Sequence, residues 1–476
     1  MAEWFSADAW LNRTLAAAGD AIWTYLLIGL LVGCALWYTV RVRFLQFRRI
    51  GEMFRVLGRS GVGDKDRGSR ISAFQAFSVS MATRVGTGNL AGVATAITIG
   101  GPGAVFWMWI MAIFGSSLSF IESTLAQIFK KKEKESFIGG PAYYIRKGLG
   151  KKWLAGLFAV LIIVNFGMAN NSIQANTICS AMEGALGINP LLAGVLLSAL
   201  VLVVIFGGIH RISNVSSIIV PLMAISYLGL ALFIICRHIG MIPDVLGMIV
   251  KDAFGFTQIA GGGIGVTVMT GIRRGLFSNE AGEGSVPNVA ATADISHPVK
   301  QGLIQALGVF VDTLVVCSCT AFIILFSGVD INGGVSGIKL TQDAIAAEVG
   351  GIGTAFVTIA VFLFAYSTLI GNYYYMESNV RYLAGKRDVR KVLFVSRLLS
   401  GCVFVMFGAA ASLDLVWTVG DLCMALQTVV NLAAIILLGR YAIKALADYN
   451  AQKRRGVRDP EFHRDTLPKL DLEEWE

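Results

Sequence analysis

The chain has 476 residues, of which 55% are hydrophobic and only 15% are charged, and its formal net charge is +9. A soluble domain is nearer a quarter charged, so this composition, with a mean hydropathy of +0.67, excludes an ordinary soluble protein. Many apolar runs reach the roughly 20 residues that span a hydrocarbon core. We therefore predict an all-α polytopic membrane protein.

The apolar runs predict eleven transmembrane helices in chain order. They lie at about 21–40, 73–99, 104–129, 153–184, 190–209, 212–236, 258–292, 298–327, 351–381, 391–411 and 415–442. Two amphipathic stretches, near 243–254 and 340–349, are too short to span a bilayer. We predict that they form interfacial or external helices.

Lysine and arginine set the predicted orientation. With the N-terminus outside, only four of the 40 fall on the outer side, namely Arg13, Arg237, Lys251 and Lys339. This pattern places the C-terminus in the cytoplasm and the protein in the plasma (inner) membrane, and it explains the basic charge without nucleic acid. The basic loops and tail are expected to lie against anionic lipids of the cytoplasmic leaflet. The tail lacks hydrophobic periodicity and is expected to be mobile.

Two interrupted spans divide the chain into repeats. The spans at 73–99 and 258–292 both contain glycine clusters, and each opens a set of five spans. Because five is odd, the two sets have opposite topology, and broken helices at matching positions of an inverted repeat indicate a secondary-transporter site. The predicted divisions are an N-terminal helix and basic loop (1–72), a first repeat (73–236), an external amphipathic segment (237–257), a second repeat (258–442) and a cytoplasmic tail (443–476).

The middle of the first interrupted span consists of Gly86, Thr87, Gly88 and Asn89. Glycine weakens a helix, and the asparagine amide needs partners in a region without water. Two interpretations stay open. The glycines either let a neighbouring helix pack closely, or they break the helix at the membrane midplane to hold a small polar ligand.

A break here would create two binding ends. The outer half begins near Leu90, where free N–H groups and the helix dipole favour a carboxylate. The inner half ends near Val85, and its free carbonyls, including that of Ala82, suit a small cation. An amino-acid carboxylate with Na⁺ fits these electrostatics.

Amide side chains gather in the fourth span. Asn171 and Gln174 belong to a set of five amides within twelve residues. Amides inside hydrocarbon must face protein or a wet cavity, so they either hold helices together or line a site. In the seventh span, Met269 and Thr270 lie near mid-depth and are candidates for the same site.

The ninth span carries Ser367 and Thr368 near its middle. Their hydroxyls either bond back to their own helix or complete a Na⁺ shell, since small oxygen ligands suit a hard cation. In the eighth span, Asp312 is a lone intramembrane acid. It is either functional or paired with Arg84 or Arg397.

Charged residues close the seventh span. Arg273 and Arg274 are candidate partners of Glu280 and Glu283 at a cytoplasmic helix end, which we favour over a proton relay. The sequence contains no Walker A loop, GxSxG or HExxH motif, so nothing indicates an enzyme. The seven cysteines lie in apolar spans without metal-ligand spacing, and we expect neither disulfides nor a cofactor.

Three separated stretches carry a family resemblance. They are residues 86–97, which begin GTGN, residues 100–115 (GGPGAVFWMWIMAIFG) and residues 274–282 (RGLFSNEAG). They resemble the alanine or glycine:cation symporters, and the resemblance covers about residues 20–445. It implies the leucine-transporter fold, with one N-terminal helix and a 5+5 inverted repeat, in the amino acid-polyamine-cation superfamily. It also implies Na⁺-driven, sometimes H⁺-driven, uptake of small neutral amino acids.

The resemblance further implies contacts to the substrate backbone at Gly86 to Asn89 and a polar contact at Thr368. Family members that carry alanine or glycine often show Gly-Trp before a run of tyrosines, where this chain has Gly371 and Asn372. An amide in place of an indole opens the pocket and makes it more polar. Glutamine therefore becomes a candidate substrate.

The expected function is sodium-coupled symport of alanine, glycine or glutamine into the cytoplasm by alternating access. Proton coupling is the alternative, and a channel, which needs a continuous lined path, is a further one. The expected partners are the amino acid, Na⁺ and membrane lipids. The Na⁺ is expected near Ala82, Val85, Ser367 and Thr368.

Overall fold

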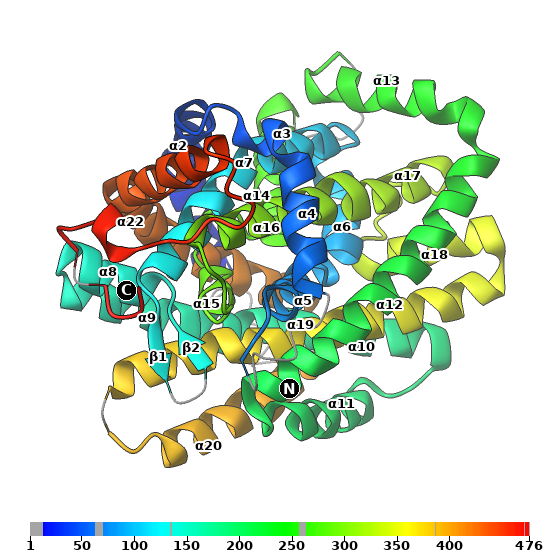
Figure 1. The fold of residues 1–476 in the computed structure, drawn as a ribbon. Coiled ribbons are helices and arrows are strands. Elements are labelled where there is room, and N and C mark those ends of the chain that lie inside the picture. The colour runs from blue at the N-terminus through cyan, green and yellow to red at the C-terminus, as the bar shows by residue number, and fades with distance from the viewer. Residues whose placement is uncertain are drawn as a thin grey trace.

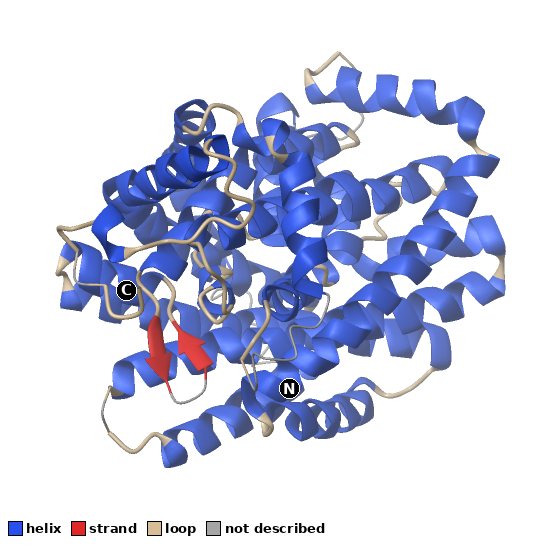
Figure 2. Ribbon diagram, viewed as in Figure 1, coloured by secondary structure: helices blue, strands red, loops and turns tan. Residues whose placement is uncertain are grey.

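The computed structural model describes residues 13–61, 70–133, 136–256, 263–385, 387–470 and 472–475. Within these ranges the chain is built of helices apart from one antiparallel hairpin, β1 (Lys131–Glu133) with β2 (Ser136–Ile138) (Figure 2). Residues 1–12, part of the basic loop and the start of the predicted span 258–292 lie outside the described residues.

The helices follow one another through short connections. The first half of the chain forms η1 (Trp23–Leu27), α2 (Ile28–Arg41), α3 (Leu45–Arg48), α4 (Ile50–Gly61), α5 (Ala73–Arg84), η3 (Gly88–Gly92), α6 (Val93–Gly100), α7 (Gly103–Ile128), α8 (Pro141–Leu149), α9 (Lys152–Val164), η4 (Asn165–Ala169), α10 (Asn170–Leu186), α11 (Pro190–Ile205), α12 (Gly208–Arg237), η5 (Ile239–Met241) and α13 (Ile242–Ala253). The second half forms α14 (Gly263–Asn279), α15 (Pro287–Ala290), α16 (Pro298–Val309), η6 (Phe310–Cys317), α17 (Ser318–Phe326), α18 (Gly337–Val349), α19 (Gly351–Ala384), α20 (Arg390–Leu398), η7 (Leu399–Val403), α21 (Phe404–Ala410), α22 (Leu413–Arg454) and η8 (Arg464–Thr466).

Eight helices within the described residues are long and apolar enough to cross a membrane, and each coincides with one predicted span. The chain is therefore a multi-pass membrane protein. At the three remaining predicted spans the helices are shorter. These are the two interrupted spans and the span at 190–209, where α11 has 16 residues. The amphipathic helices expected near 243–254 and 340–349 are present as α13 and α18.

Two groups of helices pack around the broken spans. α7 lies along both α14 and α16, and α10 lies along both α19 and α21 (Figure 1). The long helix α19 also contacts α5, so the first broken span lies between the two groups. Apolar side chains fill the contacts, and most polar residues of α5, η3 and α10 are buried with them.

Both interrupted spans are broken helices. α5 begins with a capping box in which Ser72 and Gln75 exchange side-chain hydrogen bonds with each other's backbone N–H groups. It ends at Arg84 because Val85 leaves helical geometry, with ψ of 77°. In the second broken span the backbone takes positive φ after α14 at three alternate positions: Glu280 (φ 55°), Gly282 (φ 88°) and Gly284 (φ 85°).

The C-terminal tail is packed onto the protein, so the expectation of a mobile tail was wrong. α22 runs twelve residues past the predicted end of the last span, and the tail then returns across α7 and α16. The backbone N–H of Phe462 donates to the Ser296 carbonyl at 2.9 Å, and the Trp475 indole donates to the Gln127 carbonyl at 3.1 Å. The tail has no period, but its widely spaced apolar residues are buried: Phe462, Leu467, Leu472 and Trp475.

Candidate functional site

The first break allows the backbone to approach α10, α14 and α19 closely. A Cβ atom on Gly86 would collide with Thr368 Oγ1 and would lie 3.1 Å from Gln174 Oε1. A Cβ atom on Gly88 would lie 3.0 Å from the ring of Phe277. Both positions therefore require glycine because of a close approach.

Side-chain oxygens accept hydrogen bonds from two backbone N–H groups at the break. The N–H of Gly86 is shared between Asn89 Oδ1 and the Arg84 carbonyl, each at 2.9 Å. The N–H of Thr87 donates to Gln174 Oε1 at 3.2 Å. Both groups open the helical segment that continues through η3 and α6, where the helix dipole favours negative charge. A carboxylate that replaced these two side-chain oxygens would leave neither donor unpaired.

A buried carboxylate joins the two broken helices. Asp312 Oδ1 accepts from the Asn89 amide at 2.6 Å, and Asp312 Oδ2 accepts from the Ser278 hydroxyl at 2.7 Å. Thr313 donates to the same carboxylate at 2.8 Å. Asn89 belongs to the first broken helix and Ser278 to the last turn of α14, so one side chain is bonded to both.

Neither arginine considered as a partner of Asp312 reaches it. Arg84 donates to the backbone carbonyl of Gln305 at 3.0 Å, and Arg397 donates to the Tyr373 hydroxyl at 3.0 Å. Of the two alternatives left open for Asp312, the structure does not show the pairing with Arg84 or Arg397. Arg84 is fully buried, and among the described residues it forms no ion pair. It uses neutral oxygen acceptors instead.

Oxygen atoms gather on the α5 side of the break. The Thr368 hydroxyl donates to the Ala82 carbonyl at 2.7 Å, and the Ser367 hydroxyl lies 3.4 Å from the same carbonyl. Both hydroxyls also lie within 2.9 Å of the Phe364 carbonyl of their own helix. Because each hydroxyl has one proton, it serves one acceptor at a time. Val85 is buried at the end of the same turn of α5.

The amides expected on the fourth span meet Asn372 on α19. Its Nδ2 donates to Oδ1 of Asn170 and of Asn171, each at 3.0 Å. Gln174 also donates to Asn170 at 3.0 Å. Asn372 Oδ1 and Thr87 Oγ1 are buried, and neither has a hydrogen-bond partner in the part of the chain that the structure describes. Since a buried unpaired polar atom is costly, both are positions at which a polar ligand would bond.

Two of the candidate residues lie away from the break. The Met269 sulfur is 3.4 Å from Arg273 Nη2 and 3.7 Å from the Thr24 hydroxyl, so it faces the N-terminal helix. Thr270 packs against Gly100 at the far end of α6. The reason is that α14 continues unbroken through both positions, and its break comes some ten residues later.

Phe277 and Ser278 occupy the place expected for those two residues. A Cβ atom on Gly88 would lie 3.0 Å from the Phe277 ring and 3.3 Å from the Cα of Ser278. Both belong to the RGLFSNEAG stretch, directly before the left-handed Glu280. Locating the break at the Glu280-Ala-Gly-Glu-Gly run would have identified them.

The charges at the end of the seventh span pair differently from the prediction. Arg274 binds Asp421 of α22 at 2.5 Å, and Arg273 lies 3.5 Å from the same carboxylate. Glu280 and Glu283 instead accept hydrogen bonds from neutral side chains. The predicted pairing was wrong because about one and a half turns of helix separate the arginines from the acids and direct them toward α22.

Glu122 of α7 accepts hydrogen bonds from the backbone of the second break. Its carboxylate accepts from the backbone N–H of Gly282 at 3.2 Å and of Gly284 at 3.1 Å, and from the Asn431 amide at 2.9 Å. The side chain is fully buried. Glu122 is a functional residue that the sequence patterns did not reveal to us, although an acid inside the predicted span 104–129 is a signal of a special role.

The site therefore combines two broken helices, helix-terminal N–H groups that donate to side-chain oxygens, and a set of hydroxyl and carbonyl oxygens. The family model described as the sodium:alanine symporter family matches residues 8–464. The chain belongs to the sodium:alanine symporter family. The resemblance inferred from three short motifs is thus confirmed.

Individual relatives agree with this assignment. The probable sodium/glutamine symporter GlnT of Bacillus subtilis (strain 168) is 51% identical over 457 residues, which cover 96% of this chain and 94% of the relative. The amino-acid carrier protein AlsT of the same organism is 45% identical over 470 residues, 98% of each chain. A solved structure of the Eremococcus coleocola manganese transporter shares the fold, with a TM-score of 0.51 and 14% identity over 84% of this chain and 83% of that one.

Members of the sodium:alanine symporter family are transporters. The chain is therefore a cation-coupled amino-acid transporter and not an enzyme, as expected from its sequence. The family name gives Na⁺ as the coupling ion, and the family indicates no cofactor.

Proposed function

We propose that this family member carries a neutral amino acid together with Na⁺ into the cytoplasm, and that it prefers glutamine to alanine and glycine. The observation that carries the proposal is the first break. On one side of it lie two helix-terminal N–H groups, and on the other lie two hydroxyls beside the Ala82 carbonyl.

The N–H groups of Gly86 and Thr87 are the proposed anchor for the substrate carboxylate. At present they bond to Asn89 and Gln174, whose oxygens stand where carboxylate oxygens would lie. Binding would release Asn89 Oδ1 and Gln174 Oε1 for the substrate ammonium group. A zwitterion could thus satisfy the donors of the break and the acceptors it displaces.

Na⁺ is proposed to bind among the Ala82 carbonyl and the hydroxyls of Ser367 and Thr368. The ion would accept lone pairs from both hydroxyl oxygens, while both O–H groups donate to the Phe364 carbonyl. Hydroxyl and carbonyl oxygens are hard ligands that suit such a cation. The free carbonyl end of α5 adds the negative end of a helix dipole.

Glutamine is proposed because an amide cluster around Asn372 adjoins the break through Gln174. Asn372 Oδ1 lacks a donor, and a carboxamide NH₂ group would supply one. An alanine methyl group would leave this oxygen unpaired. The relative at 51% identity carries the name of a probable sodium/glutamine symporter, which supports this choice.

Alternating access is proposed to use the two breaks of the 5+5 inverted repeat, with spans 73–129 and 258–327 rocking against the other helices. Asp312 supports the grouping because it bonds to Asn89 and Ser278 and so ties the broken helices together. The proposed orientation, with the C-terminus in the cytoplasm, rests on the lysine and arginine distribution.

Proton coupling is the second candidate. It is favoured by one observation: Asp312 is a fully buried carboxylate bonded to three neutral donors and to no cation among the described residues. A proton on Asp312 would remove its charge. Symport with H⁺ would then place the driving ion on the eighth span instead of beside Thr368.

Uptake of labelled glutamine, alanine and glycine into proteoliposomes tests the proposal. We expect glutamine uptake that follows an imposed Na⁺ gradient and does not follow a pH gradient in Na⁺-free buffer. Counterflow of labelled glutamine should occur, because a carrier exchanges its substrate and a channel does not. Uptake driven by pH alone would favour the Asp312 proposal, and preference for alanine would contradict the glutamine assignment.

A further inference from the structure

A groove lined by arginines lies where the first transmembrane helix turns into the membrane plane. It is formed between the α2–α4 turn and the C-terminal half of α22, and its volume is about 370 Å³. Five arginines line it: Arg41, Arg43, Arg48, Arg49 and Arg454. We propose that this groove binds the phosphodiester headgroup of an anionic lipid.

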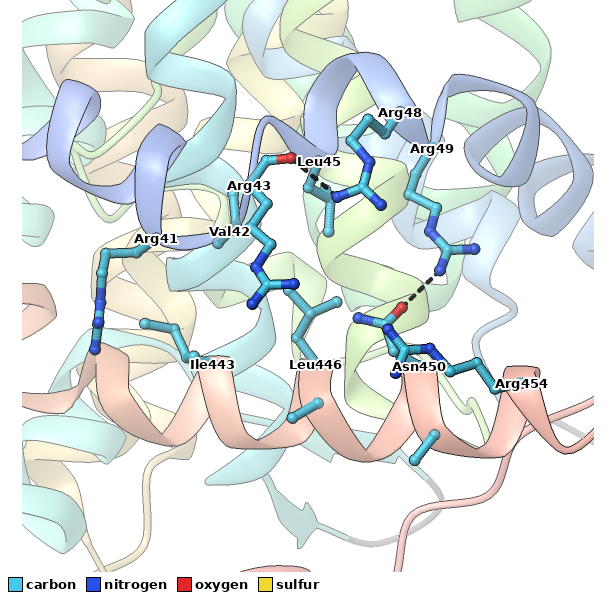
Figure 3. A pocket seen from close by; sticks show the side chains of 12 residues that line it. Arg41, Val42, Arg43, Leu45, Arg48, Arg49, Ile443, Leu446, Asn450 and Arg454 are labelled. Atoms are coloured by element: carbon cyan, nitrogen blue, oxygen red, sulfur yellow. Dashed lines mark hydrogen bonds between the residues drawn. The ribbon is translucent and has the colours of Figure 1, made fainter.

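The guanidinium groups converge on the groove. Figure 3 shows Arg43 and Arg48 reaching from the turn, and Arg454 reaching from α22, into the space between the two segments. Arg49 lies at one end and donates to Asn450 Oδ1 at 2.7 Å. Guanidinium forks recognise phosphate oxygens with paired N–H bonds, so this arrangement suits a phosphate better than a single small anion.

No acid neutralises these arginines. The lining contains no Asp or Glu, and none of the five arginines forms an ion pair within the described ranges. Glu52, the acid of the adjoining helix α4, is instead bonded to Arg55, Lys453 and Tyr449. The groove therefore carries positive charge that only a bound anion or the surrounding solution can balance.

The backbone of the turn is held in an unusual conformation. Arg43 and Phe44 both have positive φ, 56° and 54°, a backbone conformation that residues other than glycine rarely adopt. The Arg48 guanidinium donates to the Arg43 carbonyl at 3.3 Å and so fastens this turn. Strained backbone of this kind persists at sites where the surroundings fix it, and here it directs Arg43 into the groove (Figure 3).

The groove lies at the boundary between lipid-facing and charged surface. Trp37 and Val40, in the turn of α2 before Arg41, each expose 62% of their surface. On α22, Leu437 exposes 58%, one to two turns before the lining residue Ile443. Exposed apolar side chains at this depth face lipid acyl chains. A lipid whose headgroup binds the arginines would therefore place its acyl chains beside Trp37, Val40 and Leu437.

The chemistry of the groove also fits the size of a headgroup. A volume of about 370 Å³ lies within the range of small-molecule sites, roughly 300–1,000 Å³, and suits a phosphate with a glycerol unit. Buried Val42, Leu45 and Leu446 form an apolar floor beneath the arginines. On the predicted orientation, the groove faces the anionic cytoplasmic leaflet.

Lipid titration of the purified protein in detergent tests the site, with thermal unfolding and native mass spectrometry as readouts. We expect phosphatidylglycerol to raise the unfolding temperature and to remain bound as a discrete adduct, and phosphatidylcholine to do neither. Inorganic phosphate at the same concentration should give a smaller shift, because it has no chains to bind the apolar surface.

Variants locate the effect. Arg454 makes no hydrogen bond to another described residue, so Arg454→Gln should fold normally and weaken the apparent phosphatidylglycerol affinity about fivefold. The triple variant Arg43→Gln, Arg49→Gln, Arg454→Gln should lose more than tenfold. A matched variant that removes three exposed charges elsewhere on the same predicted face (Arg387→Gln, Arg390→Gln, Lys391→Gln) should keep the response.

Three results would overturn the proposal. These are equal stabilisation by phosphatidylglycerol and phosphatidylcholine, an unchanged phosphatidylglycerol response in the Arg454→Gln and triple variants, and a full-sized shift with inorganic phosphate alone. An equal loss of response in the matched variant would show general charge screening instead of a site. Transport activity does not enter these readouts, so they are independent of the proposed substrate.

Discussion

The Asn89 amide nitrogen donates to Asp312 Oδ1 at 2.6 Å, and the amide oxygen of the same side chain accepts the Gly86 N–H at 2.9 Å. The Asn89 side chain thus bonds both to the backbone of the break and to Asp312 in the eighth span. Asp312 carries the connection onward to Ser278 in the second broken helix.

Replacing Asn89 with leucine should abolish uptake. Leucine cannot bond to Gly86 or to Asp312, so a buried carboxylate loses one of its donors, and we expect a loss of about 1–3 kcal/mol in stability. Initial rates of uptake in proteoliposomes and thermal unfolding check both effects. Asn332→Leu, at an exposed position between α17 and α18, is the control. Normal uptake by Asn89→Leu would remove the break from the mechanism.

Replacing Thr368 with alanine should raise the Na⁺ concentration for half-maximal uptake. The change removes the hydroxyl that lies 2.7 Å from the Ala82 carbonyl. Loss of one such ligand, worth about 1.4 kcal/mol, corresponds to roughly a tenfold increase. Thr354→Ala, earlier on the same helix, should leave the Na⁺ dependence unchanged. If Thr368→Ala behaves like that control, the cation binds elsewhere, and Asp312 becomes the leading candidate.

Replacing Asn372 with tryptophan should shift selectivity from glutamine to alanine and glycine. The indole has no acceptor for a substrate carboxamide and narrows the amide cluster around Asn170 and Asn171. We expect the ratio of glutamine to alanine uptake to fall roughly tenfold or more. Asn372→Ser, which is small and polar, should retain glutamine uptake. Glutamine uptake that survives the tryptophan would contradict the pocket assignment.

The first break could be predicted because its signals are local. Gly86 weakens a helix and the Asn89 amide needs partners in lipid, so their positions marked a possible break, which the structure shows beside them. The amphipathic helices α13 and α18 were predictable for the same reason, since a face pattern and a length suffice. Ser367 and Thr368 were found by their depth, and the structure places both beside Ala82.

Long-range pairings could not be predicted. A helical pattern gives the face of Arg274 but not its partner, and Asp421 lies 147 positions away along the chain. Met269 was predicted to line the site because we placed the break at the middle of the seventh span. In the structure the residues with positive φ begin at Glu280. The tail was wrongly predicted to be mobile because its buried residues, such as Trp475, are widely spaced and show no hydrophobic periodicity.

The docked tail should loosen as the pH falls. His297 is buried, which lowers its pKa to about 4, although Asp448 at 3.3 Å opposes the shift and Lys300 adds to it. An unfolded histidine titrates near 6.5. Between pH 6.5 and 4 the undocked form therefore binds more protons, so stability present at pH 7 is lost progressively as the pH drops through this window.

Limited proteolysis of the tail across pH 4 to 8 measures this effect. Cleavage after the arginines and lysines beyond residue 454 should accelerate below about pH 6.5. His297→Gln, which cannot titrate, should flatten the profile, and His210→Gln, at an exposed position, should not. A profile that His297→Gln leaves unchanged would show that another group controls the docking of the tail.

Replacing Glu122 with glutamine should disable the second break. The carboxylate accepts from the N–H groups of Gly282 and Gly284 through different oxygens, and glutamine would turn an NH₂ group toward one of those donors. Because hydrogen bonds to charged groups contribute about 1.5–3 kcal/mol, we expect lower thermal stability and at least a tenfold loss of uptake. Glu183→Gln, at an exposed position on α10, is the matched control. Full activity in Glu122→Gln would mean that the left-handed glycines hold the break without the carboxylate.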